Sequence, residues 1–250
     1  MHAIILAAGY ATRLYPLTKD RPKPLLKLGD KPLIDHILVT LEELKCVDHI
    51  YVVTNAKFSS HFQQWADETG KANRFPDFDI TVVNDGTTSN ETRLGAIADI
   101  QFVIDKHDLA GELLVAAGDN VYRSSFTAML SLYREKQADV VLAYPVDDLA
   151  KLRRSGIMEL DADQRLVGFE EKPEQPKSNY VAPAFYMYKS DTLPLFKRYL
   201  EQGNNPDAPG NFTGWLYQQK PVYAHILREP YYDIGTLEAY QRVNDIFENN

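Results

Sequence analysis

Basic residues gather in one short stretch near the N-terminus of this 250-residue chain. An apolar run from Ala3 to Ala8 is typical of a buried first strand, and it ends at Gly9. Glycine lets a backbone turn tightly and approach a ligand, so that its amides can face phosphate oxygens. Five cations follow against one acid, Asp20: they are Arg13, Lys19, Arg21, Lys23 and Lys27. The stretch predicts a phosphate-binding loop, with a solvated basic loop as the alternative.

Three prolines stiffen the same loop, because proline fixes φ and lowers the entropy that closing over a ligand would cost. They are Pro16, Pro22 and Pro24. Neither a Walker A pattern nor G-x-G-x-x-G is present, which excludes the two commonest nucleotide-binding motifs.

Two aspartates later in the chain have types and positions suited to a metal. Asp119 closes an apolar strand, and Asp233 precedes the glycine of a turn into the last helix. Either carboxylate could be a magnesium ligand, or a helix cap or turn aspartate. A third polar group, Glu170-Glu171-Lys172, is by itself typical of a solvated edge. Six histidines show no metal-binding spacing.

Strands and helices alternate through the first half of the chain and must position these groups. Such alternation predicts right-handed crossovers, a largely parallel sheet, and ligands at the carboxyl ends of its strands, where Gly9 and Asp119 fall. The second half adds antiparallel strands, with a hairpin turn over 161–164. Strands are expected at 49–54, 80–83, 112–117, 140–146, 156–160, 165–170, 180–188 and 222–227. Helices are expected at 32–44, 59–68 (capped by Ser59 or Ser60), 92–106, 125–136, 190–202 and 236–248, with loops at 85–91 and 203–210.

Composition limits the function classes. The net charge of −8 and a hydrophobic content of 44% indicate a globular chain with a core, and argue against nucleic acid or an anionic membrane as partner. One cysteine, Cys46, excludes an internal disulfide, and no run of about 18 apolar residues or signal peptide is present. We therefore expect a cytoplasmic enzyme.

The N-terminal motif, L-A-[AG]-G-x-[GA]-x-R followed by P-K-x-L, resembles the signature of nucleotidyltransferases that make nucleotide sugars. The resemblance implies that the loop wraps a nucleoside triphosphate, with Arg13 on the leaving phosphates and Lys23 stabilising charge at the α-phosphate. Ala11 departs from the motif, since many members have a second glycine there. The remaining nucleotide-binding residues that the resemblance implies in this loop are Leu6, Ala7, Ala8, Gly9 and Thr12.

Two further motifs, G-D-N and [WY]-x-D-x-G-T, occupy the family's metal-aspartate positions in the same order. The resemblance implies that Asp119 and Asp233 hold Mg²⁺, that Asp119 is also catalytic, that Gly118 contacts nucleotide and that Asn120 contacts the acceptor. The segment Asn84 to Ala96 corresponds to the loop that faces the nucleobase, which places Asn84, Arg93 and Gly95 on the nucleotide. For Arg93 the alternative is simple exposure on the first turn of a helix. The family's usual G-x-A run is absent there, so the base stays open.

The stretch E-E-K-P-x-x-P-K-S-N-Y resembles that of the glucose-1-phosphate thymidylyltransferases. It implies that Glu171 accepts hydrogen bonds from sugar hydroxyls and that Lys172 pairs with the acceptor phosphate, beside Gly156 and Ala182. Ser155 replaces a tyrosine of those enzymes, and Ala182-Pro183-Ala184 replaces Val-Thr-Gly. Glucose is therefore not assumed as the acceptor.

The resemblance covers nearly the whole chain and implies a Rossmann-like three-layer α/β/α fold with a mostly parallel central sheet and an antiparallel acceptor-binding extension. We interpret 1–250 as a single domain, with a nucleotide half to about 136 and an acceptor half from 137. The expected reaction joins an NTP and a sugar 1-phosphate to give an NDP-sugar and pyrophosphate, with Mg²⁺ and without a general base. Alternatives are a cytidylyltransferase for a small non-sugar phosphate or phosphonate such as phosphocholine, and a silent nucleotide-binding regulator. The family's habit favours a homodimer.

Overall fold

The structure, a computed structural model, describes residues 1–248, and its internal contacts divide the chain into two compact units. The first unit consists of Met1–Leu94, Ala116–Ser125 and the segment 229–248. The second unit consists of Gly95–Val115 and Phe126–Arg228. The interpretation as a single domain with a nucleotide half and an acceptor half stays a prediction.

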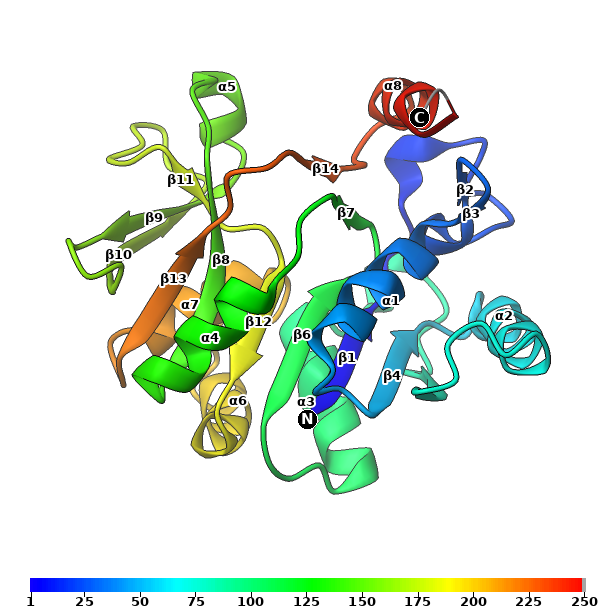
Figure 1. Cartoon of the computed structure of the whole chain (residues 1–250), viewed down its shortest axis with the longest axis horizontal. Coiled ribbons are helices and arrows are strands. Elements are labelled where there is room, and N and C mark those ends of the chain that lie inside the picture. The colour runs from blue at the N-terminus through cyan, green and yellow to red at the C-terminus, as the bar shows by residue number, and fades with distance from the viewer. Residues whose placement is uncertain (249–250) are drawn as a thin grey trace. The chain divides into compact units, whose positions relative to one another are not determined.

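The first unit is built on parallel strands. β1 (His2–Leu6) pairs with β4 (His49–Thr54), which pairs with β5 (Asp79–Asn84), and Figure 1 shows β1 and β4 side by side. Ala3, Ile4 and Ile5 are fully buried, as expected for a strand covered on both faces. Helices α1 (Leu33–Leu44) and α2 (Ser59–Lys71) complete these βα repeats.

The first unit also contains two small two-stranded sheets. β7 (Asn120–Tyr122) pairs antiparallel with β14 (Tyr231–Asp233), and β2 (Lys27–Leu28) pairs with β3 (Lys31–Pro32). Short 3-10 turns follow β1: η1 (Thr12–Leu14) and η2 (Lys23–Leu25). Helix α8 (Leu237–Glu248) packs on β2, where the Tyr240 hydroxyl donates a hydrogen bond to the Lys27 carbonyl at 2.6 Å.

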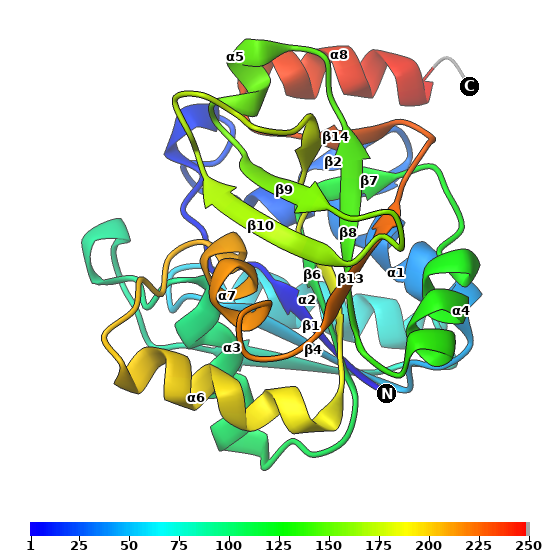
Figure 2. The same ribbon diagram turned by 90° about the vertical axis from the view of Figure 1, so that its left-hand side faces the viewer.

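The second unit is centred on β8 (Asp139–Pro145), which pairs parallel with β13 (Val222–Ile226) and antiparallel with β12 (Phe185–Tyr188) and β11 (Tyr180–Val181). Beyond β11 lies the antiparallel hairpin that Figure 2 shows, β9 (Gly156–Leu160) with β10 (Leu166–Glu171). β6 (Leu113–Ala117) runs from the second unit into the first. The helices are α3 (Ala96–His107), α4 (Thr127–Lys136), α5 (Leu149–Leu152), α6 (Leu193–Glu201) and α7 (Pro209–Leu216).

The predicted fold class is confirmed: the chain is α/β, with a mostly parallel central sheet and an antiparallel extension. The hairpin over 161–164 is also confirmed, because the Asp161 amide donates to the Arg165 carbonyl at 3.0 Å. No helix of the described residues has the length and apolarity needed to cross a membrane.

Several predicted elements were wrong in detail. The strand expected over 180–188 splits at residues 182–184, because Pro183 has no amide hydrogen to continue the ladder. The helix expected from Thr92 begins at Ala96, after Gly95 adopts a φ of 95°. Neither Ser59 nor Ser60 caps α2; its N-cap is Phe58, whose amide donates to Asn55 Oδ1 at 3.1 Å.

Helices α5 and α7 were not predicted. The sequence of α7 begins with Pro209, which suits the first helical position, but carries Gly210 and Gly214, which are poor helix formers in a helix interior. Tertiary packing decides it, since Phe212 and Leu216 are buried and both glycines lie against Phe169 of β10.

Candidate functional site

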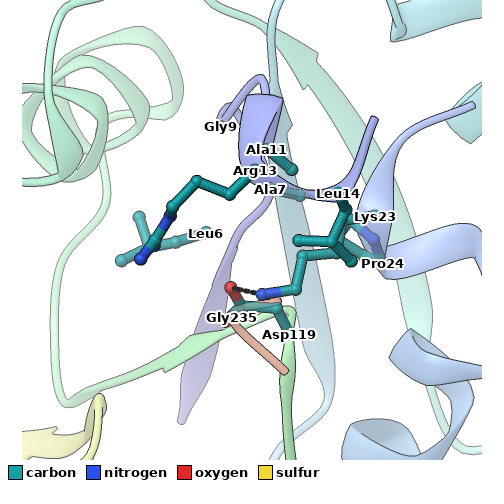
Figure 3. Close-up of a pocket in the computed structure, with 10 residues that line it drawn as sticks. All are labelled: Leu6, Ala7, Gly9, Ala11, Arg13, Leu14, Lys23, Pro24, Asp119 and Gly235. Atoms are coloured by element: carbon teal, nitrogen blue, oxygen red, sulfur yellow. Dashed lines mark hydrogen bonds and ion pairs between the residues drawn. The ribbon is translucent and has the colours of Figure 1, made fainter. Parts of the chain in front are cut away.

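A pocket of about 230 Å³ lies at the carboxyl end of β1, within the first unit. Figure 3 shows Lys23 and Asp119 joined there, with the Arg13 side chain extending from the glycine loop. Six of the predicted site residues line it: Leu6, Ala7, Gly9, Arg13, Lys23 and Asp119. Four more lining residues were not singled out as contacts: Ala11, Leu14, Pro24 and Gly235. Ala11, Pro24 and Gly235 lie within motifs that the sequence displays and Leu14 directly follows one, which is the signal that could have found them.

Lys23 is the buried cation of this pocket. Only 6% of the residue is exposed, and its Nζ donates to Asp119 Oδ2 at 2.7 Å. An ammonium group has three donors, so the ion pair with Asp119 leaves two for other oxygens. The pair therefore holds a positive charge in a fixed place at the pocket wall.

The sharp turn of the loop lies at Ala11 and not at Gly9, which corrects the sequence-based reasoning. Ala11 adopts a left-handed φ of 47°, a conformation that favours glycine, and its carbonyl accepts hydrogen bonds from the Leu14 amide and the Thr18 hydroxyl. A Cβ at Gly9 would meet no atom within 4 Å. Gly9 therefore leaves open space on the pocket side, which agrees with the expectation that a ligand can approach the backbone there.

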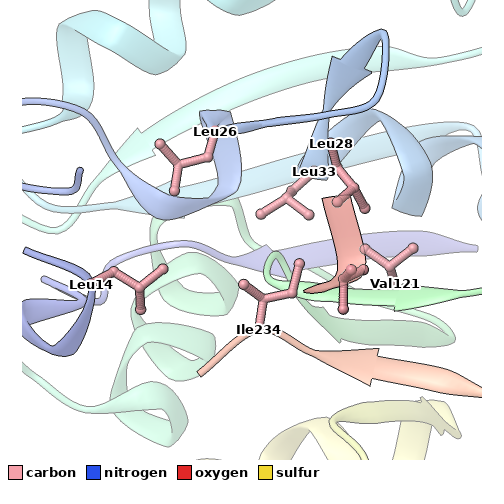
Figure 4. Close-up of a cluster of buried hydrophobic side chains, with 7 residues drawn as sticks. Leu14, Leu26, Leu28, Leu33, Val121 and Ile234 are labelled. Atoms are coloured by element: carbon pink, nitrogen blue, oxygen red, sulfur yellow. The ribbon is translucent and has the colours of Figure 1, made fainter. Parts of the chain in front are cut away.

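A buried apolar cluster joins the segments that carry the pocket loops, and Figure 4 shows its side chains coming together from those segments. Leu14 adjoins Arg13, Val121 follows two residues after Asp119, and Ile234 adjoins Asp233. The other members are Leu26, Leu28, Leu33 and Val243. Since these residues come from segments far apart in sequence, packing alone can bring the loops together.

Asp233 reaches the same neighbourhood through strand pairing. Its register partner across the β14–β7 ribbon is Asn120, the residue after Asp119. Asp233 Oδ1 lies 3.9 Å from the Cβ position of Gly235, which lines the pocket. The late strand thus pairs with the strand that follows Asp119, and a metal shared by Asp119 and Asp233 stays a prediction.

These carboxylates fit a magnesium ion of the kind that substrate phosphates complete. Oxygen donors suit Mg²⁺, which usually takes one or two carboxylates and keeps water or phosphate oxygens for the remaining positions. Among residues 1–248, no three His, Cys, Asp or Glu side chains gather as a ligand set. That Asp119 and Asp233 are the protein ligands of such a site stays a prediction.

The other predicted nucleotide residues lie outside the lining of this pocket. Ala8 accepts a hydrogen bond from Asn55 Nδ2 at 2.8 Å, and Asn84 Oδ1 accepts one from the Gly86 amide at 2.8 Å. Thr12 is exposed in η1, and Arg93 is exposed after η3 (Asn90–Thr92), where it donates to the Asn90 carbonyl. Their contacts with nucleotide stay predictions.

Two of the predicted glycines have packing roles. A Cβ on Gly118 would come within 3.1 Å of the Leu6 carbonyl, where the end of β6 lies beside β1. A Cβ on Gly95 would come within 2.7 Å of the Pro206 carbonyl. Both glycines are therefore required by close backbone approach, whether or not they contact nucleotide.

The predicted acceptor residues of the second unit lie together. Gly156 and Glu171 are register partners across β9 and β10, and the Ala182 amide donates to the Gly156 carbonyl at 3.0 Å. The Lys172 Nζ lies 3.5 Å from Glu171 Oε1. Asn120, also predicted to contact the acceptor, belongs to the first unit, where it is buried and donates to the Tyr122 hydroxyl at 3.3 Å.

Phe169 fills the space beside this group. Its ring atoms lie within 2.8 Å of the Cβ positions of Gly156, Gly210 and Gly214, and Glu171 Oε2 lies within 2.9 Å of those of Gly156 and Gly210. The three glycines therefore make room for one aromatic ring and one carboxylate. Nothing in their sequence spacing connects α7 with the hairpin, so the sequence analysis missed this contact.

A family model described as nucleotidyl transferase matches residues 2–250. The chain belongs to this family. Among its relatives, glucose-1-phosphate adenylyltransferase of Clostridium novyi is 29% identical over 253 residues, which is 98% of this chain and 66% of the relative. That of Clostridium acetobutylicum is 27% identical over 263 residues, covering 99% and 67%. The chain thus spans about two thirds of the length of these nucleotidyl transferases.

Solved structures share the nucleotidyl transferase fold over their whole length. A protein described as a glucose-1-phosphate thymidylyltransferase from Bacillus anthracis, in complex with sucrose, has a TM-score of 0.82 at 22% identity and covers 100% of this chain and 96% of its own. A UDP-glucose pyrophosphorylase with UDP-glucose has the same TM-score at 19% identity, covering 99% and 98%. At these identities the likeness establishes the fold.

Proposed function

We propose that this nucleotidyl transferase joins an NTP and a sugar 1-phosphate to give an NDP-sugar and pyrophosphate. The observation that carries the proposal is the first-unit pocket, which gathers Arg13, Lys23 and Asp119 at the end of β1. The relatives support the sugar phosphate acceptor, because they are described as acting on glucose 1-phosphate with an adenylyl or a thymidylyl group. The match between motif positions and pocket residues supports the triphosphate.

In this mechanism an acceptor phosphate oxygen attacks the α-phosphorus in line, and the bond to the leaving pyrophosphate breaks. The attacking oxygen is already anionic near neutral pH, so no general base is needed. Lys23, buried and held by Asp119, places its remaining donors where negative charge develops. Arg13, which is exposed at the pocket, supplies planar donors suited to the leaving phosphates.

Asp119 and Asp233 would hold Mg²⁺, which neutralises phosphate charge when it is bound. Lys23 already occupies one oxygen of Asp119, so the carboxylate would serve the lysine and the metal through different oxygens. A cytoplasmic location and a homodimer belong to the same proposal and rest on the sequence resemblance.

A pyrophosphate-release screen of ATP, UTP, dTTP, CTP and GTP against a panel of sugar 1-phosphates tests the proposal. Phosphocholine and a phosphonate are included as acceptors. Turnover with a sugar 1-phosphate that stops on adding EDTA and returns with Mg²⁺ is the expected result. Turnover with CTP and phosphocholine alone would identify a cytidylyltransferase, and nucleotide binding without turnover in any combination would identify a silent regulator.

A further inference from the structure

The second unit holds a cavity of about 330 Å³, where the predicted acceptor residue Lys172 meets Arg153, a residue outside the motifs. Its lining consists of Arg153, Lys172, Pro173, Glu174 and Gln175. Two cations therefore face one carboxylate, in a chain whose overall net charge is −8. A small cavity with an arginine and a lysine on its wall suits a small anion.

Arg153 is held in place by backbone contacts on both sides. Its amide donates to the Leu149 carbonyl at 3.1 Å, at the end of α5, and its Nε donates to the Glu174 carbonyl at 2.9 Å. Asp148 fixes the start of α5 by accepting from the Ala150 and Lys151 amides. Among residues 1–248, no carboxylate forms an ion pair with Arg153. Its terminal guanidinium nitrogens are therefore available to an anion.

Lys172 is attached to the same loop. Its amide donates to the Ser155 carbonyl at 3.0 Å, and its backbone adopts a left-handed φ of 51°. That conformation costs a residue with a Cβ about 1–2 kcal/mol, so the surrounding contacts must maintain it. The side chain is 61% exposed, and its acidic neighbour Glu171 lies at 3.5 Å. Arg153 and Lys172 thus reach one cavity from two segments that hydrogen bonds join.

We propose that Arg153 is a second phosphate-binding arm of the acceptor site, acting beside Lys172 on the phosphate group of the acceptor. The proposal rests on the proposed function for the identity of the ligand. The residue Ser155 supports the proposal. It replaces the tyrosine of the resembling enzymes, and its hydroxyl donates to the Lys151 carbonyl at 2.9 Å, which helps to fix the loop that carries Arg153. A planar guanidinium presents two N–H donors in a fixed plane that matches two phosphate oxygens, whereas an ammonium acts as a point charge without that fixed geometry.

Direct binding provides the first test. Wild-type protein without NTP is titrated with inorganic phosphate, glucose 1-phosphate and glucose by calorimetry. Inorganic phosphate and glucose 1-phosphate are expected to bind, because the cavity wall supplies positive charge for an anion. Glucose, which is uncharged, is expected not to bind. Arg153→Gln should weaken both phosphates about five- to twentyfold, as expected for a lost charged hydrogen bond. Arg153→Lys, which keeps the charge without the planar fork, should have a phosphate affinity between those of the wild type and Arg153→Gln.

Arg154→Gln is the matched control. Arg154 is the next residue, is also exposed, and donates from its Nε to the Ala150 carbonyl at 3.0 Å without lining the cavity. Its replacement should change phosphate affinity less than twofold. Equal losses in the two variants, or no loss in Arg153→Gln when its thermal melting is unchanged, would overturn the proposal.

Steady-state kinetics provide the second test and separate this proposal from the proposed function. Arg153→Gln should raise the acceptor KM about five- to twentyfold and leave the NTP KM within twofold. If it instead weakens only product inhibition by pyrophosphate, the cavity serves free pyrophosphate and the assignment is overturned. Phosphate binding that depends on Arg153 in a protein without turnover would overturn the proposed function while the anion site stands.

Discussion

The cations of the two pockets are held in different ways. In the first unit Lys23 is 6% exposed and ion-paired at 2.7 Å, and the same unit holds a cluster of buried side chains from four chain segments. In the second unit the Lys172 side chain is 61% exposed, its acidic neighbour is at 3.5 Å, and hydrogen bonds of the backbone fix its loop. Charge in a buried place is worth more to a transition state than charge in water. We therefore expect the chemical step at the first pocket and substrate recognition at the second.

The largest effect is expected from removing the buried cation. Lys23→Ala should lower kcat by roughly two to three powers of ten and change the NTP KM less, because the lost charge acts mainly where charge develops. Steady-state pyrophosphate release measures this. Lys19→Ala, an exposed lysine of the same loop outside the pocket lining, should retain near-normal kcat. A Lys23 variant as active as the Lys19 variant would remove Lys23 from the mechanism.

Truncating one buried side chain in each unit tests whether the two pockets are supported independently. Leu14→Ala removes a side chain from the cluster below the first pocket, and Leu152→Ala removes one from the small cluster with Val146, Ile157 and Val181 in the second unit. Each should lower the free energy of unfolding by about 2–4 kcal/mol in urea titrations. Leu14→Ala should also weaken NTP binding, and Leu152→Ala should raise only the acceptor KM. NTP affinity that falls equally in both variants would contradict the separation.

Glu171→Gln sharpens the recognition side. The acceptor KM should rise by about tenfold, while NTP affinity measured by calorimetry without acceptor stays within about threefold. Glu170→Gln is the control, since that neighbouring carboxylate pairs with Lys177 at 2.6 Å on an exposed edge. If Glu171→Gln weakened NTP binding as much as acceptor binding, the assignment of Glu171 to the acceptor would be wrong.

Lowering the pH should reduce the stability of the folded protein through protonation of His36. Burial lowers the pKa of His36 from its usual value of 6.5, although the ring contacts the Leu28 carbonyl at 3.1 Å. The unfolded chain therefore takes up the proton first, and the stability present above pH 6.5 is lost as the pH falls toward the lower folded pKa. Thermal melting between pH 7.5 and 5.5 should show a shallower decline for His36→Gln than for the wild type. Identical pH slopes would rule this histidine out as the cause.

The smallest effect is expected at the turn of the nucleotide loop. Ala11→Gly relieves the left-handed φ of 47° but gives the unfolded chain more freedom, so the free energy of unfolding should change by less than about 1 kcal/mol. Gln164→Gly, at a φ of 62° in the β9–β10 hairpin, is the matched change in the second unit. Urea titration measures both. A large gain at Ala11 alone would show that strain concentrates in the nucleotide loop.

Local sequence was sufficient where one short segment sets its own structure. The run from Ala3 to Ala8 indicates a buried strand because all its side chains are apolar. Of the cations after Gly9, Arg13 and Lys23 line the pocket, and their contacts with phosphate stay a prediction. Helical spacing likewise locates α1 to within a residue of its start. The two aspartates are visible as motif residues, and the motif order indicates the family.

Tertiary structure alone decided the features that join distant segments. Lys23 meets Asp119 across 96 residues, and Asp233 reaches Asn120 only through the β14–β7 pairing. Helix α7 forms against its own propensity because Phe169 fills the space over its glycines. Arg153 faces Lys172 because two loops exchange hydrogen bonds. No local pattern encodes these contacts, since each depends on the free energy of burying side chains or pairing backbones that only the folded chain brings together.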